Sequence, residues 1–570
     1  MRREITGCII CAMIIGAILM IEVPEGVSAQ ITEEWVARYN SPGNYSDRAT
    51  DIAVDSSGNV YVIGGCVHPT WDESDYITIK YDSSGNELWV RRYNGPGNEH
   101  DIAFDLVLDS YENVIVTGRS HNGTTDLDYT TIKYDPLGNE LWIAKYNSPD
   151  NYDDQAFAIA IDSSDNVYVT GKSNRYFYFP GGFHSHYDYT TVAYDSLGNE
   201  LWVARYNGPI DDGWDEATAI AVDDLSGDIY VTGQSEGNGT KYDYATIKYD
   251  ASGNELWAAR YNGPGNYVDL AKSLIIDASG NVFVTGRSDG GSTNYDYATI
   301  KYDPLGNEMW VQRYNGPGDG SDRAYSIALD SLGNIFVTGG SDGGVTNQDF
   351  ATLKYDSDGN ELWVARYEGP GNSSEWTQDI AIDSLNNIYV TGYSGINPNY
   401  DITTLKYDSS GNQLWIATYN GPGNDWDMGR ALYVDVSGNV YVTGYSTGIG
   451  TEHDMTTIKY SYQEPKPEPT IDIDPDTLNL KSKGRWITAY ITLNSPYEVD
   501  DIDISTVILE DTVQAEWGDI QNDTLMVKFD RSEAEDMLSP GTYNLKVTGK
   551  LTDGTEFEGY SDEMRVIEPP

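Results

Sequence analysis

One phrase recurs along this chain and limits what the chain can fold into. Residues 81–98 read "YDSSGNELWVRRYNGPGN", and close copies follow at 249–266, 355–372 and 407–424. A recurrence of this length indicates a repeat architecture, in which each unit packs on its neighbours. The tryptophan of the phrase returns every 52 to 60 residues, at Trp35, Trp89, Trp142, Trp202, Trp257, Trp310, Trp363 and Trp415.

Each unit contains four short segments in which apolar and polar residues alternate. In the fifth unit the segments are "KSLIID", "NVFVTG", "DYATIKYD" and "NEMWVQRY", and Gly, Asn, Asp or Pro separate them. Alternation rich in β-branched and aromatic residues, interrupted by turn residues, is typical of strands. Four strands per unit at this period predict the blade of a β-propeller.

The two ends of the repeat array complement each other. The array begins on a fourth-type segment at residues 31–39 and ends on a third-type segment at 454–460. The N-terminal strand can therefore complete the last unit, which leaves no free sheet edge. We predict an all-β fold, an eight-bladed β-propeller closed by the N-terminal strand, and we prefer it to an open solenoid.

The N-terminus and the composition predict where the protein acts. Residues 1–29 combine two arginines, an apolar run and small residues, as a secretory signal peptide does, so we expect a secreted or cell-surface protein with no membrane span in the mature chain. Of the three cysteines only Cys66 follows the signal, so no internal disulfide can form. The net charge of −55 repels nucleic acid, which excludes nucleic-acid partners. We expect a monomer.

A second domain follows the repeats. The Pro-rich residues 461–470 predict a linker, and 471–570 contain strand-like segments with one helical turn near 532–538. We predict a small β-sandwich, which resembles the immunoglobulin-like accessory domains of prokaryotic surface proteins. The expected order is a signal peptide (1–29), the propeller (30–460), the linker and the sandwich.

The repeats also resemble a known family. "DIAVDSSGNVYVIG", "AIAIDSSDNVYVTG" and "SIALDSLGNIFVTGG" are similar to the SBBP-type β-propeller repeat of secreted and surface proteins of bacteria and archaea. The pattern extends over residues 31–460. The resemblance implies a propeller and little about activity, and the family name implies seven blades where this chain supplies eight units.

A carboxylate stands eight residues before the turn aspartate of every first strand. We predict that these side chains circle the mouth of the central channel, where they either fix the loops through hydrogen bonds or bind Ca²⁺. Their spacing matches no calcium-loop motif. The second strands end in Ser, with Cys66 in its place in the first unit, and the third strands begin with Asp. The eight carboxylates are Asp47, Asp101, Asp154, Asp215, Asp269, Asp322, Glu375 and Asp427.

The third unit has the longest loop of its class, "NRYFYFPGGFHSHYDY" at 174–189. Exposed rings on a loop suit the apolar faces of sugars or a protein partner, although the loop can also fold over the channel mouth and bury its own rings. Two histidines without a third ligand are more typical of a solvated pair than of a metal site. The candidate ligand-binding residues are Tyr176, Phe177, Tyr178, Phe179, His184 and His186.

The sequence offers little for an enzyme. "YDSSGNELW" resembles the tryptophan-docking turn of quinoprotein dehydrogenases and the Asp-box of sialidases, and in both families the resemblance implies a structural element. The mature chain has no cysteine pair, no G-x-S-x-G elbow and no H-E-x-x-H motif. Most arginines occupy repeated positions in the fourth segments, so we expect no arginine cluster that holds a carboxylate.

We therefore expect a binding protein rather than an enzyme. The variable loop rim of the propeller would hold a surface glycan or a protein partner, because rigid scaffolds carry binding residues on their loops. Two alternatives are a non-catalytic structural component of a surface layer and a quinoprotein-like or glycosidase-like propeller enzyme.

Overall fold

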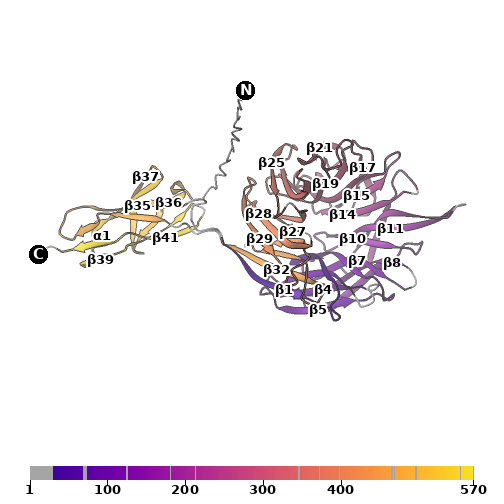
Figure 1. Ribbon diagram of the computed structural model, residues 1–570, viewed down its shortest axis with the longest axis horizontal. Helices are drawn as coiled ribbons and strands as arrows, with labels where there is room; N and C mark the ends of the chain where they lie inside the picture. Colours follow the sequence, from indigo (N-terminus) through magenta and orange to yellow (C-terminus); the bar gives the residue numbers. More distant parts are fainter. Residues whose placement is uncertain are drawn as a thin grey trace, which may run out of the picture. The chain divides into compact units, whose positions relative to one another are not determined.

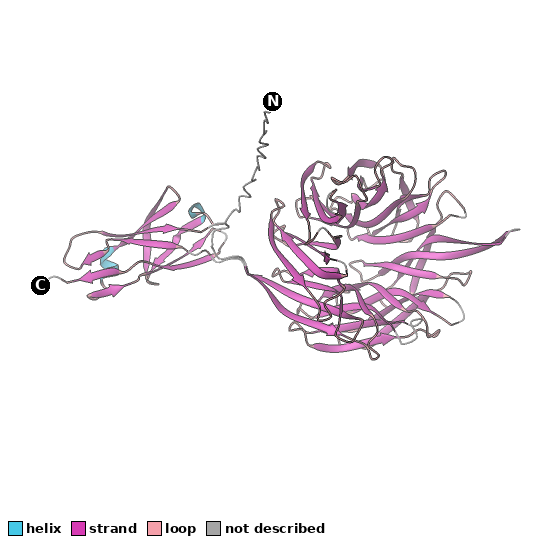
Figure 2. Cartoon of the chain, in the orientation of Figure 1, coloured by secondary structure: helices cyan, strands magenta, loops and turns pink. Residues whose placement is uncertain are grey.

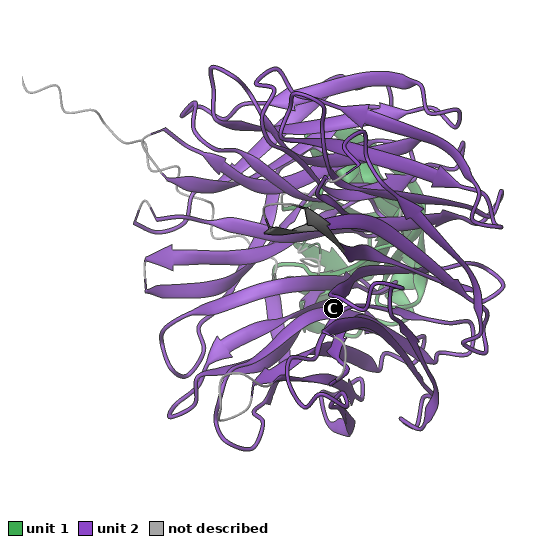
Figure 3. Ribbon diagram, turned by 90° about the vertical axis from the view of Figure 1, so that its right-hand side faces the viewer, with its two compact units in different colours: residues 1–30, 463–570 green, residues 31–462 purple. Residues whose placement is uncertain are grey.

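The computed structural model describes residues 30–67, 74–123, 126–179, 182–211, 213–344, 347–371, 373–396, 398–463, 467, 469–494, 497–552 and 554–568. The chain divides into two compact units, Ile31–Tyr462 and a second that includes Gln463–Pro570 (Figure 3). Almost all regular structure in the described residues is strand, which confirms the all-β prediction (Figure 2). The predicted signal peptide lies outside the described residues.

The unit Ile31–Tyr462 is built from four classes of strand. The first strands are β2 (Asp47–Val54), β6 (Ile102–Leu108), β10 (Asp154–Ile161), β14 (Asp215–Asp223), β18 (Asp269–Ile276), β22 (Arg323–Leu329), β26 (Trp376–Ile382) and β30 (Asp427–Val434). The second strands are β3 (Val60–Val67), β7 (Val114–His121), β11 (Val167–Phe179), β15 (Asp228–Glu236), β19 (Val282–Asp289), β23 (Ile335–Asp342), β27 (Ile388–Ile396) and β31 (Val440–Thr447). The third strands are β4 (Ser74–Tyr81), β8 (Leu127–Tyr134), β12 (Gly182–Tyr194), β16 (Tyr242–Tyr249), β20 (Tyr295–Tyr302), β24 (Gln348–Tyr355), β28 (Asn399–Tyr407) and β32 (His453–Gln463). The fourth strands are β5 (Glu87–Tyr93), β9 (Glu140–Tyr146), β13 (Glu200–Tyr206), β17 (Glu255–Tyr261), β21 (Glu308–Tyr314), β25 (Glu361–Tyr367), β29 (Gln413–Tyr419) and β1 (Gln30–Tyr39).

These strands form eight four-stranded sheets arranged in a closed circuit (Figure 1). Seven sheets use four consecutive strands, and the eighth has the order β1-β32-β31-β30, so the N-terminal strand joins the last three. Each first strand contacts the first strand of the next sheet, and β30 contacts β2. The first strands therefore surround the centre of the ring, as in a propeller.

The recurrent phrase joins neighbouring sheets. In the turn between β4 and β5, the Asp82 carboxylate accepts the backbone N–H groups of Ser84 and Asn86, both at 2.9 Å, and Gly85 takes a φ of 82°. The indole N–H of Trp89 donates to the carbonyl of Pro136, in the equivalent turn of the next sheet, at 3.2 Å. Equivalent bonds start from Trp35, Trp142, Trp202, Trp257, Trp310 and Trp363.

The last tryptophan of the series differs from the others. The Trp415 indole N–H is buried and has no hydrogen-bond partner among the described residues. Its acceptor would be the turn between the third and fourth strands of the eighth sheet. No turn joins β32 to β1, because these strands lie at opposite ends of the ring-forming sequence.

Four arginines in the fourth strands hold the seams between sheets, and we call them the seam arginines. Arg313 donates to the Tyr261 hydroxyl of the preceding sheet at 2.8 Å, to Ser288 Oγ at 2.5 Å and to Asp296 Oδ2 at 2.7 Å. The repeated second-strand Ser and third-strand Asp are thus structural. The seam arginines are Arg38, Arg260, Arg313 and Arg366.

The C-terminal unit has a seven-stranded sheet of order β33-β35-β38-β37-β36-β40-β41 and a three-stranded sheet of order β34-β42-β39. Burial alternates along β35 and β38, and residues of both sheets share one apolar core. The Asp530 carboxylate caps α1 by accepting the Ser532 N–H at 2.8 Å. The elements are β33 (Thr470–Asp474), β34 (Thr477–Asn479), β35 (Trp486–Thr492), η1 (Val499–Asp501), β36 (Ile502–Leu509), β37 (Val513–Gln521), β38 (Thr524–Asp530), α1 (Arg531–Glu535), β39 (Gly541–Tyr543), β40 (Lys546–Leu551), β41 (Glu556–Tyr560) and β42 (Met564–Ile567).

Candidate functional site

The eight first-strand carboxylates are inside the loops rather than at an open mouth. Asp322 shows the pattern: one oxygen accepts the Gly316 N–H at 2.8 Å, and the other accepts the Asp342 N–H at 2.9 Å. Of the two interpretations of these side chains, fixing the loops accounts for their contacts. All eight are 0% exposed: Asp47, Asp101, Asp154, Asp215, Asp269, Asp322, Glu375 and Asp427.

Burial also changes the acidity of these carboxyls. Desolvation raises the pKa of Asp47, Asp215 and Asp427 to about 6 and that of Asp154 to about 7, while the bound N–H groups oppose the shift. The pKa of Glu375 rises to about 7 for the same reason. Within the described part of the chain, no group of three or more His, Cys, Asp or Glu side chains is placed to hold a metal ion.

Cys66 takes the place of the repeated serine. It faces Asp47 across the β2–β3 ladder, as Ser173 faces Asp154 in the third sheet. The thiol is buried, donates to the Asp75 carbonyl at 3.7 Å, and has its pKa raised to about 12 by burial. A thiol in this state is not a reactive nucleophile.

The segment predicted as the longest loop of its class, in the third unit, is a regular hairpin in its described residues. Strands β11 and β12 remain paired from Asn174 and Tyr187 to Phe179 and Gly182, and the hairpin extends past its neighbours (Figure 1). Aromatic residues on both sides of the Pro-Gly-Gly sequence favour strands. His186 pairs with Arg175 in the ladder and is buried. The side chains of residues 176–185 lie outside the described residues, and these include Tyr176, Phe177, Tyr178, Phe179 and His184.

A second group of residues, which the sequence did not single out, faces the centre of the ring. Every first strand has a β-bulge, where one extra residue has no pairing partner in the second strand. Bulges turn side chains in new directions and are common beside functional sites. The bulge residues are Thr50, Phe104, Phe157, Thr218, Lys272, Tyr325, Gln378 and Arg430.

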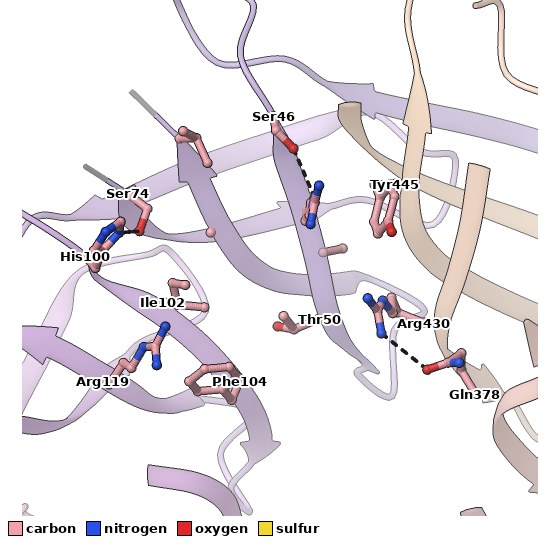
Figure 4. Close-up of a pocket in the computed structure, with 14 residues that line it drawn as sticks. Ser46, Thr50, Ser74, His100, Ile102, Phe104, Arg119, Gln378, Arg430 and Tyr445 are labelled. Atoms are coloured by element: carbon pink, nitrogen blue, oxygen red, sulfur yellow. Dashed lines mark hydrogen bonds between the residues drawn. The ribbon is translucent and has the colours of Figure 1, made fainter. Parts of the chain in front are cut away.

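A cavity of about 720 Å³ lies among β2, β6, β26 and β30, and we call it the central cavity (Figure 4). Its lining includes Arg48, Arg119, Arg430, Phe104 and Tyr445. Figure 4 shows Arg119 beside Phe104. This volume falls in the range of about 300–1,000 Å³ that is usual for ligand pockets.

The hydrogen bonds that the three arginines of the central cavity make with described residues go to neutral groups, although the charge of Asp153 also acts on Arg119. Arg119 donates to Gln155 Oε1 at 2.8 Å, and its guanidinium lies 5.6 Å from the ring centre of Phe104. Arg430 donates to Gln378 Oε1 at 3.3 Å, and Arg48 donates to a serine hydroxyl at 3.0 Å. No carboxylate of the described residues forms an ion pair with any of the three. These contacts leave positive charge available at the cavity.

Arg119 is the most confined of the three. Its Nε is buried and has no hydrogen-bond acceptor among the described residues, and burial lowers the pKa of the guanidinium. A buried donor without an acceptor is costly, and in Arg119 it belongs to a side chain that lines the central cavity.

From the sequence, most arginines were expected at repeated positions, with no counterpart to the arginine cluster with which sialidases hold a carboxylate. The expectation of repeated positions holds for the seam arginines, but Arg119 and Arg430 occupy positions that change from unit to unit. That variation within uniform repeats is the signal that could have found them. In each sheet, the residue that directly follows the buried first-strand carboxylate pairs with one residue of the second strand. From the first sheet to the eighth, these second-strand residues are Gly65, Arg119, Lys172, Gln234, Arg287, Gly340, Tyr393 and Tyr445.

Comparison with known proteins supports the repeat family. Residues 34–64, 149–176, 310–345 and 362–398 match "SBBP: Beta-propeller repeat". No helix in the described part of the chain is long and apolar enough to cross a membrane.

Two curated relatives are much longer than this chain. The "Uncharacterized WD repeat-containing protein L264" of Acanthamoeba polyphaga mimivirus is 25% identical over 65% of this chain and 37% of its own length. The "Regulatory protein FlaEY" of Caulobacter vibrioides is 31% identical over 20% of this chain and 13% of its own length.

Similarities to solved structures are distant. Sqt1 of Chaetomium thermophilum, bound to the N-terminus of ribosomal protein L10, is 11% identical, covers 75% of this chain and 99% of its own, and has a TM-score of 0.48. The polysaccharide lyase Uly1 is 10% identical, covers 74% of this chain and 92% of its own, and has a TM-score of 0.37. The chain is a propeller-repeat protein that resembles WD-repeat proteins and carries SBBP repeats in the four matched segments.

Proposed function

We propose that this protein is a secreted or cell-surface binding protein in which the eight sheets are the blades of one closed propeller. The central cavity holds part of a glycan or protein partner, without catalysis. The C-terminal unit is an immunoglobulin-like accessory domain that carries or presents the propeller. The mature protein is a monomer.

The observation that carries this proposal is the central cavity. It is lined by residues that differ among units, such as Arg119, Arg430 and Tyr445, on a frame whose other residues repeat. A rigid frame with one variable concave surface is typical of binding proteins. The relative named as a WD repeat-containing protein supports an interaction role.

Filling the cavity tests the proposal. A Cβ added at Gly65 would lie 3.5 Å from Ile102, an ordinary contact, and Tyr393 and Tyr445 occupy the equivalent position in other sheets. Gly65→Tyr should therefore fold and occlude the cavity. The experiment is a glycan and peptide array probed with wild type, with Gly65→Tyr and with Leu137→Tyr, which adds a ring at an exposed turn residue.

We expect Gly65→Tyr to lose binding and Leu137→Tyr to keep it, with both variants melting near the wild-type temperature. Binding that survives Gly65→Tyr but is lost when Tyr176, Phe177 and Tyr178 become Ala would move the site to the β11–β12 hairpin. Self-assembly without any array signal would favour the surface-layer alternative.

A further inference from the structure

The ligand of the central cavity has a definite chemistry. We infer that the cavity binds an acidic saccharide, whose carboxylate or sulfate groups are held by Arg48, Arg119 and Arg430 while its sugar rings pack on the neighbouring aromatic side chains. This inference rests on the proposed function and adds the class of ligand.

The first argument is the scarcity of positive charge in this chain. Only 35 basic residues accompany 90 acidic ones, so a basic side chain can readily find a carboxylate. The seam arginines do so, and Arg366 lies 2.7 Å from Asp349. Three arginines that line one cavity form no such ion pair with a described residue. A guanidinium matches the planar carboxylate or the sulfate oxygens through paired N–H donors.

A second set of cations repeats the arrangement in the fifth and sixth sheets. Arg287 stands where Arg119 stands in β7, Lys272 is the bulge residue equivalent to Arg430, and Arg323 is equivalent to Arg48. None of the second three forms an ion pair with a described residue. Positive charge therefore faces the centre of the ring from two separate groups of sheets.

The second set shows the cost of unpaired charge. Burial and the nearby positive charge of Arg323 lower the pKa of Arg287. Lys272 is solvent-exposed, so its lowered pKa, which Glu216 opposes, adds little to this cost. Mutual repulsion of this kind is relieved when an anion enters, and six cations in two groups suit a ligand with several anionic groups.

Three carboxylates of the first strands are bound to backbone N–H groups rather than to these cations. Asp51 accepts the Leu106 N–H at 3.1 Å. Asp105 accepts the Ile159 N–H of β10 at 2.8 Å, and Asp379 accepts the Leu432 N–H at 3.0 Å. Each thus joins its own first strand to the next one. Burial raises the pKa of all three, that of Asp379 to about 6, which reduces their capacity to act as counter-ions.

Aromatic rings among the cations favour a saccharide over an acidic peptide. The rings of Phe104 and Tyr445 lie in the lining, and Arg48 sits 5.0 Å from the centre of the Tyr445 ring. The flat apolar face of a sugar ring can pack on such a surface while its acidic substituent reaches the guanidinium. An acidic peptide would satisfy the charges but offers no comparable flat face.

The test is calorimetric titration of the full chain with four probes: oligogalacturonate, a sulfated galactose oligomer, a neutral galactose oligomer and polyglutamate. The charge variants are Arg119→Gln and Arg430→Gln, because Gln234 and Gln378 occupy the equivalent positions in other sheets. The control is Lys145→Gln/Lys241→Gln, which removes two exposed charges. Thermal unfolding checks that each variant folds.

We expect at least one of the two acidic saccharides to bind, and the preferred one identifies carboxylate or sulfate as the recognised group. Each single charge variant should bind it at least about tenfold more weakly, since a lost charge-assisted pair is worth about 1.5–3 kcal/mol and 1.4 kcal/mol is tenfold. The double variant should lose more, and the control should stay within about twofold. Raising the salt concentration should weaken binding to the wild type.

Three results would overturn the inference. Tight binding of polyglutamate alone would assign the cavity to an acidic peptide. Equal binding of the neutral oligomer, unchanged in Arg119→Gln/Arg430→Gln but lost in Gly65→Tyr, would leave the proposed binding function intact and remove the acidic ligand. Failure of both acidic saccharides to bind would also reject it, and the array with Gly65→Tyr would still test the proposed function separately.

Discussion

Arg313 and Arg287 belong to the same sheet but have opposite surroundings. Arg313, in β21, bonds a tyrosine, a serine and the Asp296 carboxylate. Burial acts to lower its pKa, but Asp296 and Tyr261 together outweigh that effect and raise it. Arg287, in β19, lies 4.7 Å from the ring centre of Tyr295, has a buried Nε without an acceptor, and has its pKa lowered.

The difference separates structure from function within one repeat. Arg313 recurs as a seam residue, and its guanidinium is bound by other residues of the chain and holds neighbouring sheets together. Arg287 occupies a position that varies among the units, and its guanidinium keeps unused binding capacity. Proteins keep such destabilising groups where function requires them. Four experiments can break or sharpen this comparison.

The largest effect is expected at a seam. Arg313→Leu leaves the Asp296 carboxylate, only 8% exposed, without its counter-ion. We expect a loss of about 3 kcal/mol in the free energy of unfolding, because an uncompensated buried charge is costly. Urea denaturation of the two proteins measures the loss. Adding Asp296→Asn to Arg313→Leu should restore part of it, and a single variant as stable as the wild type would contradict the structural role of the seam.

The second-largest loss of stability is expected at one of the buried first-strand carboxylates. Asp322→Asn keeps the shape but offers one carbonyl oxygen to two backbone donors, so the amide nitrogen must face either the Gly316 or the Asp342 N–H. We expect a loss of about 2 kcal/mol, the usual cost of a buried unsatisfied donor. The same denaturation assay measures it. If calcium raised the melting temperature of the wild type but not of the variant, the loop carboxylates would be cation ligands after all.

The third experiment measures how stability depends on pH. We expect a smaller effect than that of either substitution, with a sign opposite to that of a protein stabilised by salt bridges. Asp154 and Glu375 have native pKa values of about 7, and Asp379 one of about 6, well above the values of about 4 expected when unfolded. Between about pH 4 and 7 the native state keeps protons that the unfolded state has released, so stability falls as pH rises through this window.

We therefore expect the melting temperature to rise by at least about 2 °C between pH 8 and pH 5.5. The scans belong in about 1 M salt, which screens the repulsion of the exposed charges but not buried protonation. Glu375→Gln should reduce the rise. A melting temperature that falls toward acidic pH would show that these carboxyls are charged and well solvated in the folded protein.

The smallest effect is expected at the centre of the ring. Arg287→Gln removes a cation that is repelled by Arg323 and has no carboxylate partner, and Gln234 occupies the equivalent position in the fourth sheet. We expect the melting temperature to stay the same or rise slightly. A destabilisation equal to that of Arg313→Leu would erase the distinction between seam and centre.

The strand pattern and the ring could be read from the sequence because each unit repeats the same local signals. Alternating residues set the strands, Asp and Gly set the turns, and the complementary segments at 31–39 and 454–460 correctly placed β1 beside β32. The loop carboxylates were found by their constant spacing, although their burial was not. The recurrent tryptophan was rightly taken as structural, and its bond to the next sheet supplies the reason.

The central cavity could not be read in the same way. Arg430 faces it because a bulge shifts the register of β30 after Gly429, and a one-residue irregularity leaves no mark in an alternating pattern. Arg119 belongs to a strand of another sheet, and only the closed ring brings the two together. The β11–β12 hairpin was predicted as a loop, and its four consecutive aromatic residues at 176–179 lack the apolar and polar alternation that marks the other strands.

The closing sheet also governs how the chain can fold. Arg38 in β1 bonds Ser446 across 408 residues of sequence, whereas Arg260, Arg313 and Arg366 form the same bond across 25 residues in their own sheets. Chains are synthesised from the N-terminus, so β1 is made long before β30, β31 and β32 exist. The ring is therefore completed in one late, non-local step. Such a step is slow because the two strands that must meet are separated by almost the whole unit. Until that step, β1 presents an unpaired edge, and a partner or chaperone that covers it would determine how much protein reaches the closed state.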